Sequence, residues 1–171
     1  VTQMPSLAHD NGDLRAEVAR LTRENNELPE TLARVPAEAS LARAQAAQPE
    51  GVAASVIGFD PENALHVVTI YRGLKDHIKV DDGVITGAGV VGTVVEVDPL
   101  SSKVLRINDP TSRLTAQVQK GRWWAIAVGT LTHVKLRFIS QDAKLHVGDR
   151  VVTGEGRSFR AGVLIGRITA L

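Results

Sequence analysis

The sequence of 171 residues has no cysteine, few aromatic residues and no long apolar run. The lack of cysteine excludes a disulfide framework and thiolate metal sites. Aromatic residues make up only 4% of the chain against 43% hydrophobic residues, so we expect an aliphatic core of small branched side chains. No stretch approaches the roughly 18 apolar residues of a membrane-spanning helix. We therefore expect a soluble fragment, with room for an anchor or signal upstream of Val1.

The chain also lacks an excess of charge of either sign. Its 20 basic and 19 acidic residues give a formal net charge of +1, and both kinds occur along the whole chain. A near-neutral chain of this kind produces no strong field that would attract a polyanion. We therefore predict no nucleic-acid partner.

The usual motifs of catalysis and metal binding are missing from the sequence. Its five histidines form no His-Glu-x-x-His motif or close pair, and no cysteine is present to complete a zinc site. The serines lack the Gly-x-Ser-x-Gly elbow and the Gly-Asp-Ser-Gly loop of serine hydrolases. The acidic pair Asp81-Asp82 stands beside Gly83, which is typical of a turn. We predict no catalytic residue, no cofactor and no metal ion.

One glycine motif matches the dinucleotide-binding fingerprint by spacing alone. Gly87, Gly89 and Gly92 have the G-x-G-x-x-G spacing, and Asp109 lies near the distance expected of a ribose-binding acid. A dinucleotide site needs a helix N-terminus after these glycines to hold the pyrophosphate. Residues 90–97 are instead rich in valine, so they predict a strand, and we interpret the glycines as turn and bulge residues.

The composition changes near residue 50. Residues 1–48 are rich in Ala, Glu, Arg, Leu and Asn, which favours helix, whereas short apolar runs and turn residues alternate from residue 51 onward. We predict a mainly β fold with an N-terminal α-helical coiled coil over 1–48 and two small β-barrel-like domains, 51–111 and 112–171, between which strands can be exchanged. Ten strands are predicted, over residues 52–58, 65–72, 83–86, 90–97, 103–107, 114–119, 124–129, 134–139, 150–153 and 163–169.

Apolar residues recur at heptad spacing in the helical region. One series has a residue at every seventh position and a second series lies between its members: Leu7, Leu14, Leu21, Leu28 and Val35, then Met4, Asn11, Val18, Asn25 and Leu32. Asparagines at buried heptad positions pair across two helices and fix their register at a cost in stability. We therefore predict self-association through Leu7, Asn11, Leu14, Val18, Leu21, Asn25 and Leu28. A stripe packed on the chain's own β region has similar spacing and is the alternative.

Two prolines limit the heptad segment. Pro29 and Pro36 each remove a backbone hydrogen bond, which costs about 3 kcal/mol inside a helix. A straight helix from about Ser6 to Leu28 would span about 35 Å at about 1.5 Å per residue. We expect a second, less regular helix over 37–48 and a hinge at Pro49.

An internal repeat relates two parts of the β region. Residues 78–89 align without gaps on residues 145–156, with identities at Val80/Val147, Asp82/Asp149, Val84/Val151, Thr86/Thr153, Gly87/Gly154 and Gly89/Gly156. An apolar run with one glycine, Gly92 or Gly166, follows each copy. The repeat favours two related β units, although common hairpin sequence preferences are the alternative.

The only two tryptophans are adjacent, at Trp123 and Trp124, directly after Arg122. Neighbouring residues of a strand point to opposite faces, so one ring can enter the core while the other faces solvent or a partner. Interface hot spots are enriched in Trp and Arg. Arg122, Trp123 and Trp124 are therefore a candidate partner surface, with core packing alone as the alternative.

Seven short motifs follow one another through the β region: VIGFDP at 56–61, VTIYRG at 68–73, VDDGVIT at 80–86, GVVGTVVEV at 89–97, VLRINDP at 104–110, VGDRVVT at 147–153 and GVLIGRI at 162–168. This series resembles the extracytoplasmic region of the MreC family of bacterial cell-shape proteins. Their order and spacing are similar to those of the family over nearly all of the β region, and the heptad segment lies where the family has its coiled coil. Leu65 and His77 depart from the pattern, which leads us to expect an aromatic residue and a glycine there.

The resemblance implies a non-enzymatic scaffold attached to the inner membrane by an upstream anchor, with its coil and β-barrels outside the cytoplasm. Its implied partners are itself, as a dimer or filament, together with MreD, RodA and the elongation-specific penicillin-binding protein of lateral peptidoglycan synthesis. A periplasmic adaptor of an efflux or secretion system is the alternative. That class, however, inserts a helical hairpin between β halves, whereas all predicted helix here precedes the β region.

Overall fold

The computed structural model describes residues 16–21, 38–46, 49–59 and 66–171 of the chain. The chain divides into two compact units, Val1–Ala42 and Arg43–Leu171. Residues 16–21 and 38–46 are helical, as the composition of this region predicts. No helix within the described ranges is both long enough and apolar enough to cross a membrane. The coiled coil and the predicted domain boundaries stay predictions.

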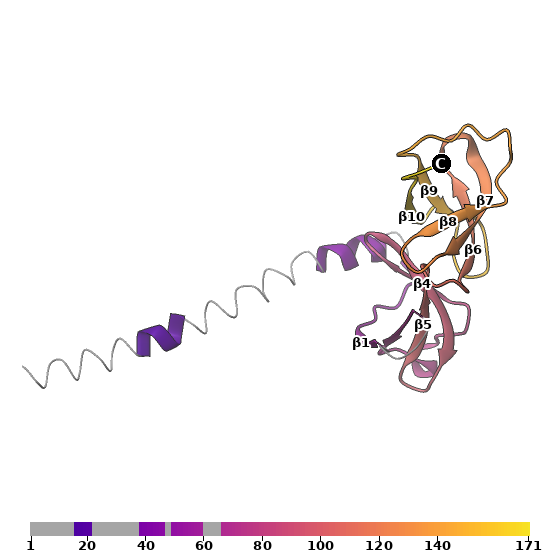
Figure 1. Ribbon diagram of the computed structural model, residues 1–171. Coiled ribbons are helices and arrows are strands. Elements are labelled where there is room, and N and C mark those ends of the chain that lie inside the picture. Colours follow the sequence, from indigo (N-terminus) through magenta and orange to yellow (C-terminus); the bar gives the residue numbers. More distant parts are fainter. Residues whose placement is uncertain (1–15, 22–37, 47–48, 60–65) are drawn as a thin grey trace, which may run out of the picture. The chain divides into compact units, whose positions relative to one another are not determined.

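The first sheet contains the strands β1 (Val56–Phe59), β2 (Val67–Ile70), β3 (Gly83–Thr86), β4 (Gly89–Val97) and β5 (Ser102–Arg106). They lie in the order β1-β2-β5-β4-β3, and each neighbouring pair is antiparallel (Figure 1). A short 3-10 helix, η1 (Leu74–Asp76), follows β2 and ends at His77. His77 has φ of 63°, a left-handed conformation that glycine adopts most readily. The family resemblance leads us to expect a glycine at this position.

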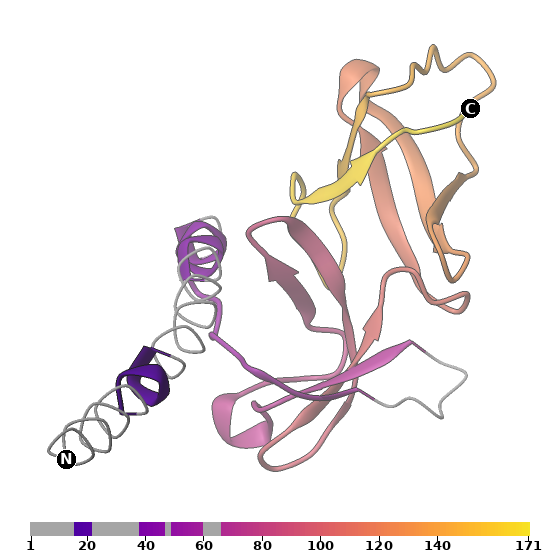
Figure 2. The same ribbon diagram turned by 60° about the vertical axis from the view of Figure 1, so that its left-hand side comes forward.

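The second sheet contains β6 (Arg113–Val118), β7 (Trp123–Gly129), β8 (Val134–Arg137), β9 (Arg150–Thr153) and β10 (Leu164–Arg167). Their order is β10-β9-β6-β7-β8, again with antiparallel neighbours (Figure 2). The 3-10 turn η2 (Lys120–Arg122) joins β6 to β7. Each sheet is therefore formed by consecutive strands of one half of the β region.

All ten predicted strands are confirmed, and the mainly β fold class with them. Most strand ends differ from the prediction by one or two residues. The first strand is the exception, because residues 52–55 precede β1 without belonging to it. Within that segment only Ser55 bonds to the chain beyond β2: its carbonyl accepts a 2.8 Å hydrogen bond from the Tyr71 N–H.

Each sheet buries a small aliphatic core, as the scarcity of aromatic residues predicts. The core of the first sheet contains Val68, Ile70, Val94 and Val104, which come from three neighbouring strands. The core of the second sheet contains Leu114, Ala116, Val118, Ala127, Val151, Phe159 and Ile168. Burying one such aliphatic side chain contributes about 1.5–3 kcal/mol relative to leaving it exposed.

The two copies of the internal repeat form the same turn. The Asp82 carboxylate accepts a 2.8 Å hydrogen bond from the backbone N–H of Lys79. The Asp149 carboxylate accepts one of 2.9 Å from the N–H of His146. The strands that follow also correspond, because Gly92 lies opposite Val84 and Gly166 opposite Val151. The sequence repeat is thus a repeated β-hairpin.

A buried carboxylate lies in the segment that connects the two sheets. Asp109 is 0% exposed and accepts hydrogen bonds from the N–H of His66 at 2.8 Å, from the N–H of Thr111 at 2.7 Å and from Thr111 Oγ1. Burial acts to raise the pKa of Asp109, but these hydrogen bonds outweigh it and lower the pKa below its ordinary value. The neighbouring Asn108 carbonyl accepts a 2.8 Å hydrogen bond from the N–H of Leu131, between β7 and β8. The connection is therefore bonded to both sheets.

Candidate functional site

The two tryptophans at the start of β7 point to opposite faces of the second sheet. Trp123 is half-buried and packs against the core of that sheet. Trp124 is 54% exposed. This division follows from the alternation of side chains along a strand. Only Trp124 is thus available to a partner, and Trp123 has a structural role.

A glycine leaves room for the Trp124 ring on the sheet surface. A Cβ added at Gly154 would lie 2.5 Å from Cζ3 of Trp124 and 2.8 Å from Cγ2 of Thr115. The indole therefore lies against the end of β9 and against β6. It is held in place while more than half of its surface stays open.

Pairing register places an apolar neighbour and several cations on the same outer face. Ile126, two residues after Trp124 and 36% exposed, lies directly opposite Arg137 of β8. Val128 of the same strand lies opposite Lys135 on one side and Arg113 on the other. We call this surface the Trp124 face; it comprises Trp124, Ile126, Arg113, Lys135, Arg137 and the directly opposed pair Arg150 and Arg167.

The charge of the second sheet differs from that of the rest of the chain. Ten of the 20 basic residues but only three of the 19 acidic residues lie between Thr111 and the C-terminus. The five strands of this sheet carry no acidic residue at all. Both kinds of charge occur in this half, as in the rest of the chain, but the basic residues are concentrated here although the net charge of the chain is +1.

Arg122, the third residue of the predicted partner surface, lies in η2 directly before β7. It has φ of 55°, and its carbonyl accepts a 3.2 Å hydrogen bond from Gln117 Nε2 on β6. Of the seven residues of the Trp124 face, sequence reasoning identified Trp124 alone. Alternation from Trp124 points to Ile126, whereas Arg113, Lys135 and Arg137 become neighbours only through strand pairing that the sequence does not show.

The predicted self-association residues are described only in part. Val18 and Leu21 lie in the helical residues 16–21 and are 62% and 50% exposed in the single chain. Leu7, Asn11, Leu14, Asn25 and Leu28 lie outside the described residues. The heptad interface therefore stays a prediction.

The first sheet exposes an apolar surface of its own along its edge. The side chains of Val56, Ile57 and Phe59 on β1 are 53%, 58% and 72% exposed, and Tyr71 beyond β2 is 49% exposed. The backbone groups on the outer side of an edge strand are available to another strand. Unlike the Trp124 face, this edge carries no basic side chain on β1.

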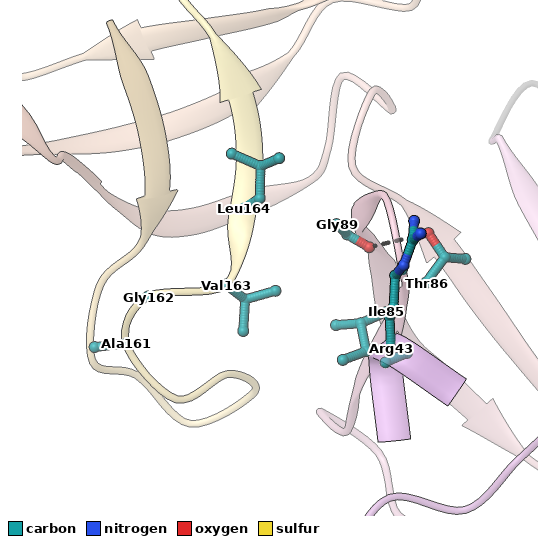
Figure 3. Close-up of a pocket in the computed structure, with 10 residues that line it drawn as sticks. Arg43, Ile85, Thr86, Gly89, Ala161, Gly162, Val163 and Leu164 are labelled. Atoms are coloured by element: carbon teal, nitrogen blue, oxygen red, sulfur yellow. Dashed lines mark hydrogen bonds between the residues drawn. The ribbon is translucent and has the colours of Figure 1, made fainter. Parts of the chain in front are cut away.

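A cavity of about 200 Å³ lies between the two hairpins of the internal repeat (Figure 3). Val163 and Leu164 line one side, and Arg43, Ile85, Thr86 and Gly89 line the other. Thr86 Oγ1 donates a 3.4 Å hydrogen bond to the carbonyl of Gly89. The lining offers no pair of groups suited to acid–base or nucleophilic chemistry.

The glycines that match the dinucleotide fingerprint lie in a β-hairpin. Gly87 is in the turn between β3 and β4, and Gly89 and Gly92 belong to β4 itself. The prediction of a strand here is confirmed, since the motif opens no helix. Among the described residues, no three His, Cys, Asp or Glu side chains come together as metal ligands would.

Comparison with known proteins gives a consistent result. A family model described as "Rod shape-determining protein MreC, barrel core" matches residues 56–171. The chain is 34% identical over 162 residues to the cell shape-determining protein MreC of Listeria monocytogenes, and the alignment covers 91% of this chain and 52% of the relative. The chain thus spans about half the length of this relative.

Solved structures show the same fold. The crystal structure of MreC from Pseudomonas aeruginosa is 32% identical and aligns with a TM-score of 0.65 over 70% of this chain and 79% of that chain. A complex between a penicillin-binding protein, PBP2, and MreC from Helicobacter pylori aligns with a TM-score of 0.58 over 68% of this chain and 75% of the matched chain. That match is only 16% identical, so it bears on the fold alone.

Proposed function

Because this chain belongs to the MreC family of cell shape-determining proteins, we propose that it is a non-catalytic scaffold of the bacterial elongation machinery. In this role it maintains rod shape by organising peptidoglycan synthesis through self-association and protein binding. The observation that carries the binding part is Trp124, a large ring held against the sheet yet 54% exposed. Exposed tryptophan and arginine are the residues most enriched at binding hot spots.

Self-association is assigned to the heptad segment. Leu7, Asn11, Leu14, Val18, Leu21, Asn25 and Leu28 would form the seam between two helices, with the asparagines fixing the register. Replacing Leu14 and Leu21 together by Asp would place two charges in that seam. We expect the double variant to be monomeric at concentrations where the unsubstituted chain is dimeric.

The proposed protein partner at the second sheet is the elongation-specific penicillin-binding protein. The complex of PBP2 with the Helicobacter pylori MreC supports a partner of this class, since the two MreC chains share a fold. Of the predicted surface, Arg122 and Trp124 would make the contact while Trp123 holds the strand to its core. MreD and RodA are the further proposed partners.

The proposed location is extracytoplasmic, with attachment to the inner membrane through an anchor upstream of these residues. The heptad segment and both sheets would then lie on the outer side of that membrane. The periplasmic-adaptor alternative is not favoured, because the family model covers residues 56–171 and both sheets lie C-terminal to the described helices.

A direct binding measurement tests the proposal. The purified chain is titrated with the extracytoplasmic domain of the elongation-specific penicillin-binding protein of the same organism. We expect binding that Trp124→Ala weakens by about tenfold or more, the size of a hot-spot loss, whereas Tyr71→Ala removes a similarly exposed ring from the first sheet without effect. Loss of binding in Tyr71→Ala but not in Trp124→Ala would instead place the docking surface on the first sheet.

A further inference from the structure

The Trp124 face has an apolar centre surrounded by cations. Trp124 and Ile126 project from β7, with Arg137 and Lys135 on the neighbouring β8 and Arg113 on β6. Arg150 and Arg167 extend the basic surface across β9 and β10. An apolar core inside a polar rim is the usual anatomy of a protein–protein contact.

The chain does not neutralise these cations itself. Among the residues the structure describes, none of the five forms an ion pair. Arg113 donates hydrogen bonds to the carbonyls of Pro110 and Ser112, and Arg167 donates one to the carbonyl of Gly148. These bonds orient the guanidinium groups without removing their charge. Five like charges on one small sheet destabilise it by mutual repulsion, which an external anionic group would relieve.

The described acidic residues of the first sheet are poor candidates for that role in a second copy. Each is already engaged within its own chain by a hydrogen bond or ion pair: Asp76 with Arg72, Asp81 with Arg157, Asp82 with Lys79, Glu96 with Lys103, Asp98 with Ser101, and Asp109 with His66 and Thr111. Carboxylates of a second copy would share their charge between these contacts and the Trp124 face, so they would pair with the cations more weakly than unengaged carboxylates would. The uncompensated charge therefore favours a different molecule.

We propose that the Trp124 face docks an acidic protein surface, in which Asp and Glu side chains surround an apolar patch that receives Trp124. This inference rests on the proposed function and specifies the chemistry of the partner at the same site. Complementary charge would raise the association rate and fix the orientation of the two proteins. Burial of Trp124 and Ile126 would slow dissociation of the complex. The apolar centre favours a protein over a simple polyanion, which would be held by the cations alone.

Charge reversal on β8 tests this proposal separately from the proposed function. Lys135→Glu with Arg137→Glu reverses two charges at the exposed edge of the face. Lys75→Glu with Lys144→Glu makes the same change in net charge at exposed residues outside the ten strands. A third variant, Lys135→Arg with Arg137→Lys, keeps the charge. Thermal melting of each variant shows that the fold is retained.

The probe is the extracytoplasmic domain of the elongation-specific penicillin-binding protein, at low and at moderate salt. We expect the β8 reversal to weaken binding by about tenfold or more at low salt, the control reversal to change it less than about twofold, and the charge-keeping variant to bind normally. Added salt should weaken the binding of the unsubstituted chain more than the binding of the β8 reversal variant.

Three results would overturn the inference. If Trp124→Ala weakens binding and the β8 reversal does not, the docking site stands but its partner surface is apolar rather than acidic. If the domain does not bind the unsubstituted chain at all, the proposed function and this inference fail together. If the β8 reversal abolishes binding to soluble glycan strands or to anionic phospholipid vesicles but not to the protein domain, the face serves a polyanion or a membrane instead.

Discussion

Gly92 and Gly166 occupy equivalent places in the repeated hairpin but have opposite surroundings. A Cβ added at Gly92 would lie 2.0 Å from the carbonyl oxygen of Leu105 and 2.9 Å from Cα of Arg106, on the neighbouring β5. These are backbone atoms inside a paired strand, so they cannot turn away as a side chain can. A Cβ added at Gly166 would meet no atom within 4 Å. The same substitution should therefore have opposite consequences at the two sites.

Gly92→Ala must separate β4 from β5 locally or break part of their pairing. Overpacking of this kind costs about 1–3 kcal/mol and occasionally more, and contact with immovable backbone places Gly92→Ala at the upper end. For a chain of this size that cost corresponds to a fall in Tm of roughly 5–10 °C. Gly166→Ala, at a φ outside the left-handed region, should leave Tm unchanged or raise it, because it stabilises by up to about 1 kcal/mol through a less flexible unfolded chain.

Thermal unfolding followed by circular dichroism measures both variants under one condition. The pair controls for the general effect of placing alanine on a strand, since both glycines lie in the second strand of the repeated hairpin. Equal losses of Tm in the two variants would refute the reasoning. So would a Gly92→Ala variant as stable as the unsubstituted chain.

Three further predictions concern single substitutions, two in the β region and one in the heptad segment. Asp109→Asn should lower the Tm at neutral pH, because the ionised carboxylate accepts hydrogen bonds from His66 and Thr111 and its pKa is lowered in the folded chain. The loss of Tm should be largest above the ordinary pKa of 3.8 and should shrink as the pH falls through the folded pKa, where Asp109 of the unsubstituted chain becomes neutral as well. Trp123→Ala should destabilise the fold by about 1–3 kcal/mol in denaturant titrations, since its ring packs on the core only in part. Asn25→Val should raise thermal stability while sedimentation shows a mixture of oligomers, and no change in either would favour an exposed helix face.

The strands could be predicted because their cause is local. Short valine- and isoleucine-rich runs between turn residues specify a strand wherever they pack, so the predicted 83–86 and 150–153 agree with β3 and β9 to the residue. The repeated turn that contains Asp82 or Asp149 can be predicted for the same reason, because its signal lies within a few neighbouring residues. Residues 52–55 were misassigned because apolar composition alone does not reveal whether a second strand lies alongside.

The candidate site could be predicted only in part because it is not local. Alternation along β7 divides Trp123 from Trp124, and this required no knowledge of the fold. The cations beside Ile126 come from β6 and β8, and their register depends on pairing that is set by the whole sheet. Net charge over the chain likewise hid the basic second sheet, because the acidic residues that balance it lie elsewhere in the sequence.

Sedimentation velocity on a mixture of the chain and the extracytoplasmic domain of the elongation-specific penicillin-binding protein tests the scaffold most directly. If the helix pairs two copies and each Trp124 face docks one synthase, the complex contains two copies of each protein. The Leu14→Asp, Leu21→Asp variant should then form a complex with one copy of each. A chain that sediments as a monomer beside an unbound synthase domain would contradict the account.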